Sequence, residues 1–376
     1  MKSISTSIVH ERFTEMGGSE KVVAALARLW PRSTLLSPII DQKILDPALR
    51  DLNPVCSPLQ RLYRGDGRYS HLLPLLPIAM ASLEIPSNTE LVVLSHHAFS
   101  NRVRIQSDIP TISYVHSPAR WMWDPVLRSA DAPGPVSNSA LSAFAATQRR
   151  ADRRAAQKPD ILIANSTEVA GRISRWWNRP SVVIPPPVDL DTDPILTRTT
   201  PREDFFLLAG RLVPYKRADI AIEAATRAGV QLVVAGDGRF RARCEEIAGP
   251  TVRFLGSVSD DELHDLYRRC RALLFPGVED FGIVPVEAMA HGAPVIGVNR
   301  GGLLDTVIHG TTGVLLEDSP IREDLVARFA TTLIAADLPS DESLIVKHAS
   351  LFSEESFAER ILEQAELVLS GQQRSR

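Results

Sequence analysis

Two glutamates in the segment 279–287 are the side chains of this chain best placed to do chemistry. Glu279 and Glu287 are separated by seven residues, which include Gly282 and Pro285. The segment predicts a loop that runs into a helix, with Pro285 at the first helical position, where its missing N–H group costs nothing. A helix start presents unpaired backbone N–H groups that attract anions. Carboxylates beside such a start fit a ligand that combines hydroxyl groups with phosphates.

A simpler interpretation of Glu287 stands beside this one. The helix dipole stabilises an acidic residue in the first turn by about 0.3–1 kcal/mol, so Glu287 alone is explained as a capping residue. The pair of glutamates with a glycine loop between them is more specific, but it needs a second element to decide between the two interpretations.

That second element is a basic loop. Arg211 and Lys216 follow an expected strand, Phe205–Ala209, and therefore lie at its carboxyl end. Arginine offers phosphate oxygens a planar fork and lysine a compact charge, so together they could neutralise a diphosphate. A lone lysine there would be explained as solvated surface. Two cations in one loop, in the same half as the glutamate pair, favour a phosphate site.

The elements that position these residues alternate between strands and helices. Short runs rich in Val, Ile and Leu show little alternation, which is typical of parallel strands buried on both faces. We expect strands at 5–10, 35–40, 91–95, 111–116, 161–165, 205–209, 232–235, 252–255, 272–276, 294–298 and 313–316. We expect helices at 20–29, 140–156, 167–176, 218–228, 260–270, 286–291 and 354–369. The pattern predicts right-handed β-α-β units in an α/β fold.

The break between two halves falls at a proline-rich stretch. Three prolines at 185–187 are followed by Asp189, Asp191 and Asp193, which together make a stiff, polar connector. We therefore expect an N-terminal domain over 1–185, a C-terminal domain over 186–352, and a last helix in 353–376 that packs back on the first domain. Asp189 and Asp191 also spell a D-x-D metal–diphosphate signature, although turn-forming aspartates explain them better here.

Composition excludes several classes of protein. The chain has 376 residues, a formal net charge of −3 and 44% hydrophobic residues, so it shows no overall bias toward nucleic acid. Its three cysteines are far apart, which argues against a disulfide framework or a thiolate zinc site and indicates a reducing compartment. We find neither a secretory signal nor an apolar run long enough to span a bilayer. We expect a cytoplasmic protein that works at most at the inner face of the cell membrane.

The motifs of the second half resemble those of the retaining glycosyltransferases of family 4. The chain has A-G-R-L-x-x-x-K, then G-D-G after a strand, then E-D-F-G-I-V-P-V-E-A-M-A-x-G-x-P-V-I and a final G-G at Gly301 and Gly302. The match is dense from Arg211 to Gly313. The resemblance implies the GT-B fold: two facing Rossmann-like domains with a deep interdomain cleft, the second holding the nucleotide sugar. It also implies a hexosyltransferase that needs neither a cofactor nor a metal.

The resemblance also implies roles for single residues. Arg211 and Lys216 would bind the donor diphosphate, Glu279 the donor-sugar hydroxyls, and Glu287 the ribose hydroxyls. Four residues between the glutamates would present backbone groups to the sugar and phosphates: Phe281, Gly282, Ile283 and Val284. With Arg211, Lys216 and Glu279, the fourth expected catalytic residue is His116.

The first half supplies His116 and a glycine pair. Gly17 and Gly18 follow the first expected strand and open a helix, which suits contact with donor phosphates but equally suits a plain strand-to-helix turn. His116 ends a strand within Y-x-H-x-P-x-R-x-x-W-D, a string that resembles bacterial mannosyltransferases of O-antigen and other polysaccharides. The resemblance therefore implies GDP-mannose as donor, a glycan or polyprenyl-linked saccharide as acceptor, and a role in polysaccharide biosynthesis.

A basic helix raises the question of membrane contact. Five cations share about half of its circumference: Arg149, Arg150, Arg153, Arg154 and Lys158. A solvated face explains them, and so does weak peripheral contact with an anionic membrane surface, which the lipid-linked acceptors of the family favour.

Three other functions stay open on the sequence alone. A nucleotide-sugar epimerase of the same fold would need only the donor. An inactive sugar-nucleotide-binding protein would keep the fold without the chemistry. An NAD-dependent oxidoreductase would need G-x-G-x-x-G at the first strand–helix turn, which neither Gly17–Gly18 nor Gly236–Gly238 supplies.

Overall fold

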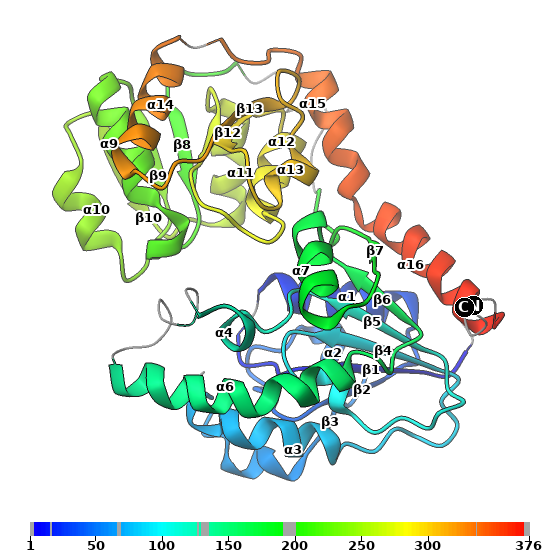
Figure 1. Ribbon diagram of the computed structural model, residues 1–376. Helices are drawn as coiled ribbons and strands as arrows, with labels where there is room; N and C mark the ends of the chain where they lie inside the picture. The colour runs from blue at the N-terminus through cyan, green and yellow to red at the C-terminus, as the bar shows by residue number, and fades with distance from the viewer. Residues whose placement is uncertain are drawn as a thin grey trace. The chain divides into compact units, whose positions relative to one another are not determined.

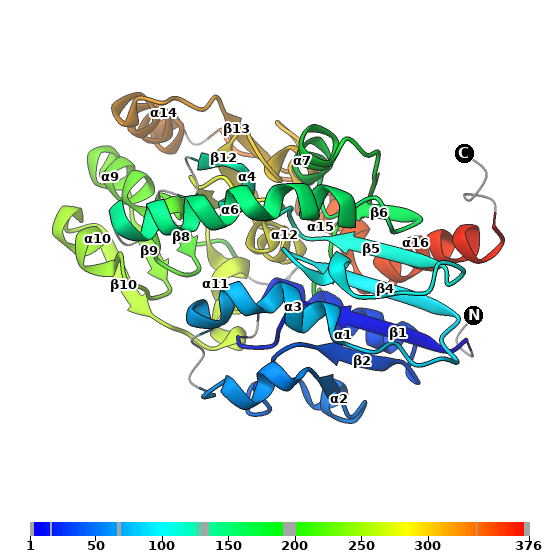
Figure 2. The ribbon, with the colours of Figure 1, turned by 60° about the horizontal axis from the view of Figure 1, so that its bottom comes forward.

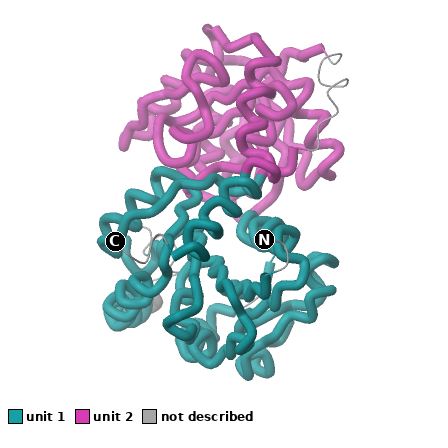
Figure 3. The backbone as a smooth tube through the Cα atoms, turned by 90° about the vertical axis from the view of Figure 1, so that its right-hand side faces the viewer, with its two compact units in different colours: residues 1–187, 357–376 teal, residues 188–356 magenta. Residues whose placement is uncertain are grey.

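A computed structural model describes residues 4–15, 17–65, 69–125, 128, 135–190, 201–335 and 337–371. The chain divides into two compact units, coloured separately in Figure 3. Unit 1 comprises residues 1–187 and 357–376, and unit 2 comprises residues 188–356. The second unit is therefore inserted between the main part of the first and its last helix.

Unit 1 is built on a seven-stranded parallel sheet in the order β3-β2-β1-β4-β5-β6-β7 (Figure 1). The strands are β1 (Thr6–His10), β2 (Thr34–Ser37), β3 (Val55–Cys56), β4 (Leu91–His96), β5 (Thr111–Val115), β6 (Ile161–Ala164) and β7 (Val182–Val183). The strand order reverses between β1 and β4. In open parallel sheets, ligands bind at the carboxyl ends of strands beside such a reversal.

Helices cover both faces of this sheet, as Figures 1 and 2 show. One face packs against α1 (Gly18–Leu29), α2 (Pro47–Arg50) and α16 (Glu354–Leu369). The other packs against α3 (Leu76–Ala81), α4 (Arg120–Trp123) and α6 (Pro135–Ala155), while α7 (Thr167–Trp177) packs near β6. Short 3₁₀ turns lie at Pro58–Leu62, Ser70–Leu75 and Ser100–Arg102.

Helix α16 belongs to the core of unit 1, although it is the last element of the chain. Its apolar residues recur at helical spacing, so they form one buried stripe. That stripe consists of Phe357, Ile361, Ala365 and Val368. The ring of Phe357 meets the ring of Tyr114, on β5, edge to face at 5.7 Å.

Unit 2 repeats the plan with a six-stranded parallel sheet in the order β10-β9-β8-β11-β12-β13. The strands are β8 (Phe206–Ala209), β9 (Leu232–Ala235), β10 (Val252–Gly256), β11 (Leu273–Phe275), β12 (Val295–Val298) and β13 (Gly313–Leu316). One face packs against α9 (Ala218–Ala228), α10 (Arg241–Ile247) and α14 (Arg322–Ala335). The other packs against α11 (Asp260–Arg269), α12 (Ile283–Ala290), α13 (Leu303–Thr306) and α15 (Glu342–Ala349). Here the order reverses between β8 and β11. Two further 3₁₀ turns lie at Pro214–Lys216 and Ser350–Phe352.

The predicted α/β class is confirmed, and all the expected strands form within a few residues of their expected bounds. Two helix starts differ most from the expected ones. Helix α6 begins at Pro135, five residues before the expected start, and α12 begins at Ile283, so Pro285 is its third residue and not its first.

Candidate active site

The candidate site of unit 2 lies where its strand order reverses. The loop after β8 carries Arg211 and Lys216, and the loop after β11 carries Glu279. Because β8 and β11 are hydrogen-bonded neighbours in a parallel sheet, both loops emerge at the same edge. The sheet topology therefore brings Glu279 to the loop of Arg211 and Lys216, although it lies far from them in the sequence.

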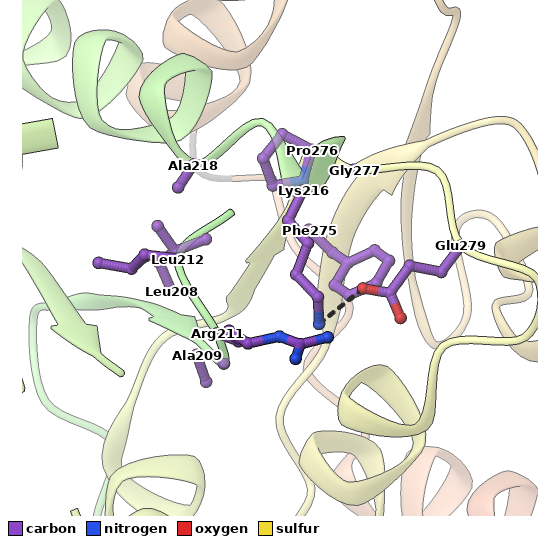
Figure 4. A pocket seen from close by; sticks show the side chains of 11 residues that line it. Leu208, Ala209, Arg211, Leu212, Lys216, Ala218, Phe275, Pro276, Gly277 and Glu279 are labelled. Carbon is purple, nitrogen blue, oxygen red and sulfur yellow. Dashed lines mark ion pairs between the residues drawn. The ribbon is translucent and has the colours of Figure 1, made fainter. Parts of the chain in front are cut away.

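Lys216 and Glu279 form an ion pair at this edge (Figure 4). The Nζ atom of Lys216 lies 2.8 Å from Oε1 of Glu279, and each side chain is about a fifth exposed, at 21% and 22%. The side chain of Arg211 extends toward the same pair and is exposed to solvent. The arrangement sets two cations and one carboxylate around a common point, which suits a ligand with both anionic and hydroxyl groups.

The hollow between these side chains is small. It is lined by the Gly210–Leu212 segment, Lys216, Phe275, Gly277 and Glu279, and it holds about 20 Å³. That volume is close to what one water molecule needs. The hollow itself is therefore too small to enclose a diphosphate.

Glycine lets the two loops approach each other closely. A Cβ atom at Gly277 would lie 2.9 Å from the Cα atom of Lys216, and one at Gly302 would lie 2.1 Å from the backbone oxygen of Phe281. Gly302 also donates its N–H to the backbone oxygen of Glu279 (2.9 Å). The glycine motifs of the sequence therefore fix the backbone that carries Lys216 and Glu279, because a side chain at either position would force the loops apart.

Glu287 is not a first-turn capping residue. It is the fifth residue of α12, and no acidic residue occupies the first turn of that helix. The expectation that Glu287 lies in the first turn was wrong because the helix begins two residues before Pro285. Its half-buried carboxylate accepts a long hydrogen bond (3.4 Å) from the hydroxyl of Tyr267. Burial raises the pKa of Tyr267 well above its ordinary value, and Glu287 raises it further, so this phenol stays protonated as a donor.

The four residues expected between the glutamates take different positions. Phe281 is buried, with its ring against Phe352 at 5.7 Å, so its side chain belongs to the core. Gly282 is the N-cap of α12 with a φ of +88°, a backbone conformation that favours glycine. Ile283 and Val284 are the first two helical residues, where backbone N–H groups lack intrahelical partners.

In unit 1, Gly17 and Gly18 open α1 after β1, as expected. Gly17 is the N-cap, and its N–H donates to Oε2 of Glu20 (3.0 Å), which is the bond that the N3 glutamate of a capping box makes. The hydroxyl of Ser19 donates to the same oxygen (2.8 Å). Both bonds hold the Glu20 carboxylate, which is buried, at the helix start.

His116 follows β5 and is almost fully buried. Burial and, to a smaller extent, the nearby His10 lower its pKa to about 3 against the opposing effect of Glu20, so its ring is neutral at physiological pH. Its Nε2 atom lies 2.8 Å from the hydroxyl of Ser95, whose oxygen also lies 2.9 Å from Nδ1 of His10. Sequence reasoning missed His10, Ser95 and Glu20. The available signal was that His10 and Ser95 end strands that the sequence predicts.

A groove lies along the basic face of α6. An open groove of about 650 Å³ is lined by Trp123, Ala146, Arg149, Arg150, Arg153, Arg154, Gln157, Trp177 and Asn178. Arg149 Nε donates to the backbone oxygen of Met122 (2.8 Å), and Arg153 Nε donates to that of Trp176 (2.9 Å). Within the described part of the chain, no carboxylate forms an ion pair with any of the four arginines.

The remaining sequence candidates contribute less. Asp189 is exposed, and Asp191 of the D-x-D string lies outside the described residues. His96 is fully buried, with Nδ1 3.0 Å from the hydroxyl of Ser100, so it belongs to the core. Of the helices that the structure describes, none combines the length and the hydropathy that crossing a membrane would require.

Comparison with known proteins agrees with this architecture. The family model described as "Glycosyltransferase Family 4" matches residues 16–192, and that described as "Glycosyl transferases group 1" matches residues 197–344. A D-inositol 3-phosphate glycosyltransferase of Rhodococcus opacus is 27% identical over 72% of this chain, and one of Geodermatophilus obscurus is 29% identical over 62%. The aligned regions span 66% and 60% of those relatives, just under two thirds of their length.

Solved structures resemble the whole chain. A sucrose-phosphate synthase of Thermosynechococcus elongatus aligns over 98% of this chain and all of its own, with a TM-score of 0.70 at 18% identity. Anabaena HepE in complex with UDP and glucose aligns over 96% of this chain and 99% of its own, with a TM-score of 0.64 at 17% identity. At this identity the likeness establishes the fold. A Family 4 region and a group 1 region therefore follow one another in two Rossmann-like units, and the chain has the fold of the GT-B glycosyltransferases and resembles those of family 4.

Proposed function

We propose that the chain transfers a hexose from a nucleotide diphosphate sugar to a hydroxyl group of a glycan or lipid-linked acceptor, with retention of anomeric configuration. The observation that carries the proposal is the placement of Lys216 and Glu279 2.8 Å apart, with Arg211 extending toward them, where the sheet order of unit 2 reverses. The relatives named as glycosyltransferases support transfer over epimerisation or binding alone.

The cations act on the leaving group in this proposal. As the glycosidic bond breaks, negative charge grows on the diphosphate while the sugar gains oxocarbenium character. Arg211 and Lys216 stabilise that charge through preorganised N–H donors, which is an electrostatic role that requires no metal. The N–H groups of Ile283 and Val284, which have no partner within α12 because they lie at its start, add to the same field.

The carboxylates bind the rest of the donor. Glu279 accepts hydrogen bonds from hydroxyls of the transferred sugar, and the Lys216 contact keeps its carboxylate oriented. Glu287, which helix capping does not explain, accepts from the ribose hydroxyls. In unit 1, the Gly17–Gly18 helix start supports the donor phosphates, and His116 bonds the donor sugar as a neutral ring.

Two donors compete in this proposal. The string around His116 favours GDP-mannose, whereas the UDP in the HepE structure favours a UDP-sugar. The experiment is a thermal-shift panel with GDP, UDP, ADP and their sugars. A nucleotide at 100 to 1,000 times its dissociation constant stabilises the fold by roughly 3–4 kcal/mol, which gives a clear rise in Tm. A shift with UDP and none with GDP would overturn the mannose assignment.

A second assay separates transfer from epimerisation. Donor alone and donor with a panel of saccharide acceptors are incubated with the enzyme, and the sugar products are followed by NMR. Transfer yields a new glycosidic bond of the donor's anomeric configuration only when an acceptor is present. Conversion of the donor sugar without acceptor would instead identify an epimerase.

We further propose that the arginine groove on α6 contacts an anionic surface at the cytoplasmic face of the membrane, where a polyprenyl-linked acceptor would lie. The groove residues Arg149, Arg150, Arg153 and Arg154 supply four cations, and Lys158 follows shortly after the helix. Each cation near an anionic bilayer adds about 1 kcal/mol. Arg150→Gln with Arg154→Gln should therefore weaken binding to phosphatidylglycerol vesicles about 30-fold.

The vesicle experiment has a matched control. Arg150 and Arg154 are exposed, so replacing them leaves the backbone bonds of Arg149 and Arg153 intact. Arg243→Gln removes an exposed charge from α10 in unit 2 and should leave vesicle binding unchanged. Equal binding of the double variant and the parent protein, measured by vesicle co-sedimentation, would rule out this contact.

A further inference from the structure

The carboxylate of Asp318 joins two loops of the candidate site in unit 2. Asp318 follows β13, and its Oδ1 atom lies 3.1 Å from Nη1 of Arg217, while its Oδ2 atom lies 2.8 Å from Nη1 of Arg300. Arg217 directly follows Lys216 in the loop after β8, and Arg300 lies in the loop after β12. One acidic side chain therefore connects the loop that carries Lys216 to the loop after β12.

Arg217 has a backbone conformation that favours glycine. Its φ is +56° and its ψ is +34°, in the left-handed region. Of the described residues other than glycine, only Asn53 and Asn178 also have a positive φ. The Cβ atom of an L-residue disfavours this region, which asparagine tolerates better than arginine does. The conformation turns the chain from the 3₁₀ turn Pro214–Lys216 directly into α9, of which Arg217 is the N-cap.

This turn places the backbone of Lys216. The Cα atom and the carbonyl group of Lys216 would all lie within 3.1 Å of a Cβ atom at Gly277, so the two segments are in close contact. A change of Arg217 to the right-handed region would rotate the 3₁₀ turn relative to α9 and so move the ammonium group that faces Glu279. The pairing of Lys216 with Glu279 therefore depends on the left-handed conformation of Arg217.

The second loop that Asp318 holds fixes the backbone of Glu279. Arg300 lies two residues before Gly302, whose N–H donates to the backbone oxygen of Glu279 (2.9 Å). The side chain of Arg300 is 63% exposed, so solvent weakens its contact with Asp318. The side chains of Arg217 and Asp318 are only 25% and 18% exposed, which makes theirs the better shielded of the two ion pairs.

Asp318 is itself held in place. Burial opposes its ionisation, but hydrogen bonds from Arg300 and Arg217 lower its pKa below the ordinary value, so it is a carboxylate at physiological pH. Its Oδ1 atom also accepts from the N–H of Ser319 (2.9 Å). The hydroxyl of Ser319 in turn donates to Asp324 (3.0 Å), in the first turn of α14. The contact that restrains Arg217 is thus anchored at the start of a helix.

We propose that Asp318 and Arg217 are positioning residues for donor binding: their ion pair offsets the unfavourable backbone conformation of Arg217 and so keeps Lys216 directed at the donor diphosphate. The inference rests on the role proposed above for Lys216. It explains why an arginine occupies a position whose backbone favours glycine. It assigns the guanidinium of Arg217 to Asp318 and not to the ligand.

Two substitutions of Arg217 separate positioning from direct contact. Arg217→Ala and Arg217→Gly both remove the guanidinium group, but only glycine adopts the left-handed region without a steric penalty. Binding of GDP, UDP and ADP to the parent is measured by calorimetry, and the nucleotide that binds most tightly is used for the variants. Arg217→Ala and Asp318→Ala should each bind it about five- to thirtyfold more weakly, and Arg217→Gly should recover most of that loss.

Dependence on Lys216 shows how the effect reaches the nucleotide. In the Lys216→Ala background, Arg217→Ala should weaken binding by less than about twofold more, because the group that it positions is already absent. A general loosening of unit 2 would instead add its full loss. Arg227→Ala is the control, since Arg227 pairs with Glu223 of α9 and Glu323 of α14, and it should leave binding unchanged. Thermal melting checks that each variant is folded.

Every outcome bears on the inference. Equal losses in Arg217→Ala and Arg217→Gly would overturn it and indicate that the guanidinium contacts the nucleotide. Parent-like binding in Arg217→Ala and Asp318→Ala, or additive losses with Lys216→Ala, would overturn it as well. The expected pattern in a protein that transfers no sugar would support the positioning role and contradict the proposed function. A parent protein that binds none of the three nucleotides would overturn both.

Discussion

Removal of Lys216 should separate catalysis from stability. In Lys216→Ala, the proposed diphosphate site loses a cation on the loop after β8, and Glu279 loses the contact at 2.8 Å. The backbone of the loop remains held against Gly277, whose close approach depends on main-chain atoms of Lys216 and not on its ammonium group. The variant therefore removes charge while the loop keeps its shape.

The two expected magnitudes differ widely. A partly exposed ion pair of this kind contributes about 0–1 kcal/mol to folding, so Tm should fall by only a few degrees. Loss of one preorganised donor to a developing charge costs about 2.7–4 kcal/mol of the activation barrier, a 10²- to 10³-fold loss of kcat. Exposed Lys347→Ala in the same unit is the control and should change neither quantity.

Binding measurements show which part of the donor Lys216 contacts. By calorimetry, Lys216→Ala should weaken binding of the nucleoside diphosphate more than tenfold and leave binding of the nucleoside unchanged. Glu287→Gln should weaken both, because it is proposed to contact the ribose. A folded Lys216→Ala protein that binds the nucleoside diphosphate like the parent, with kcat/KM within threefold, would refute the phosphate role.

Three further outcomes follow from the structure. Gly302→Ala should lower Tm and the transfer rate together, since its Cβ atom would lie 2.1 Å from the backbone oxygen of Phe281; a variant as stable and as active as the parent would contradict the close approach. Transfer should persist in EDTA, because protein cations are proposed to balance the diphosphate charge. Loss of transfer in EDTA that added Mg²⁺ restores would contradict this proposal. Burial raises the pKa of Asp152 to about 6 despite hydrogen bonds from Trp123 and Trp177, so the stability that protonation of this carboxyl contributes is lost as pH rises from about 4 to about 6. Relative to Asp152→Asn, the parent's free energy of unfolding should thus fall by up to about 3 kcal/mol over that pH range, as measured by denaturant titration. The same pH dependence in both proteins would exclude this contribution of Asp152.

The sequence predicts the sheets better than the helix boundaries. Strands such as β8 and β12 are continuous apolar runs because both faces are covered, and such runs are easily found. The start of α12 was misplaced because Pro285 is tolerated early in a helix and not only at its first position. Helix α14 was overlooked although its apolar residues recur at helical spacing after an acidic first turn.

The two sites differ in how far sequence alone could predict them. Arg211, Lys216 and Glu279 lie in recognisable motifs, and adjacent strands β8 and β11 bring them together. The link between His10 and Ser95 depends on the pairing of β1 with β4, 85 positions apart, and on their register. A shift of one residue in that register would turn either side chain to the opposite face of the sheet, and no local pattern determines it.

The position of α16 has a consequence for the order in which the protein folds as it leaves the ribosome. Unit 1 is synthesised first, yet its core lacks Phe357, Ile361, Ala365 and Val368 until the final residues emerge. At about 5–20 residues per second, the stretch of unit 2 keeps that apolar surface uncovered for roughly ten seconds or more. The nascent first half should therefore attract chaperones during that interval, and a stop codon just before Phe357 should yield a product that aggregates although every proposed donor-binding residue is present.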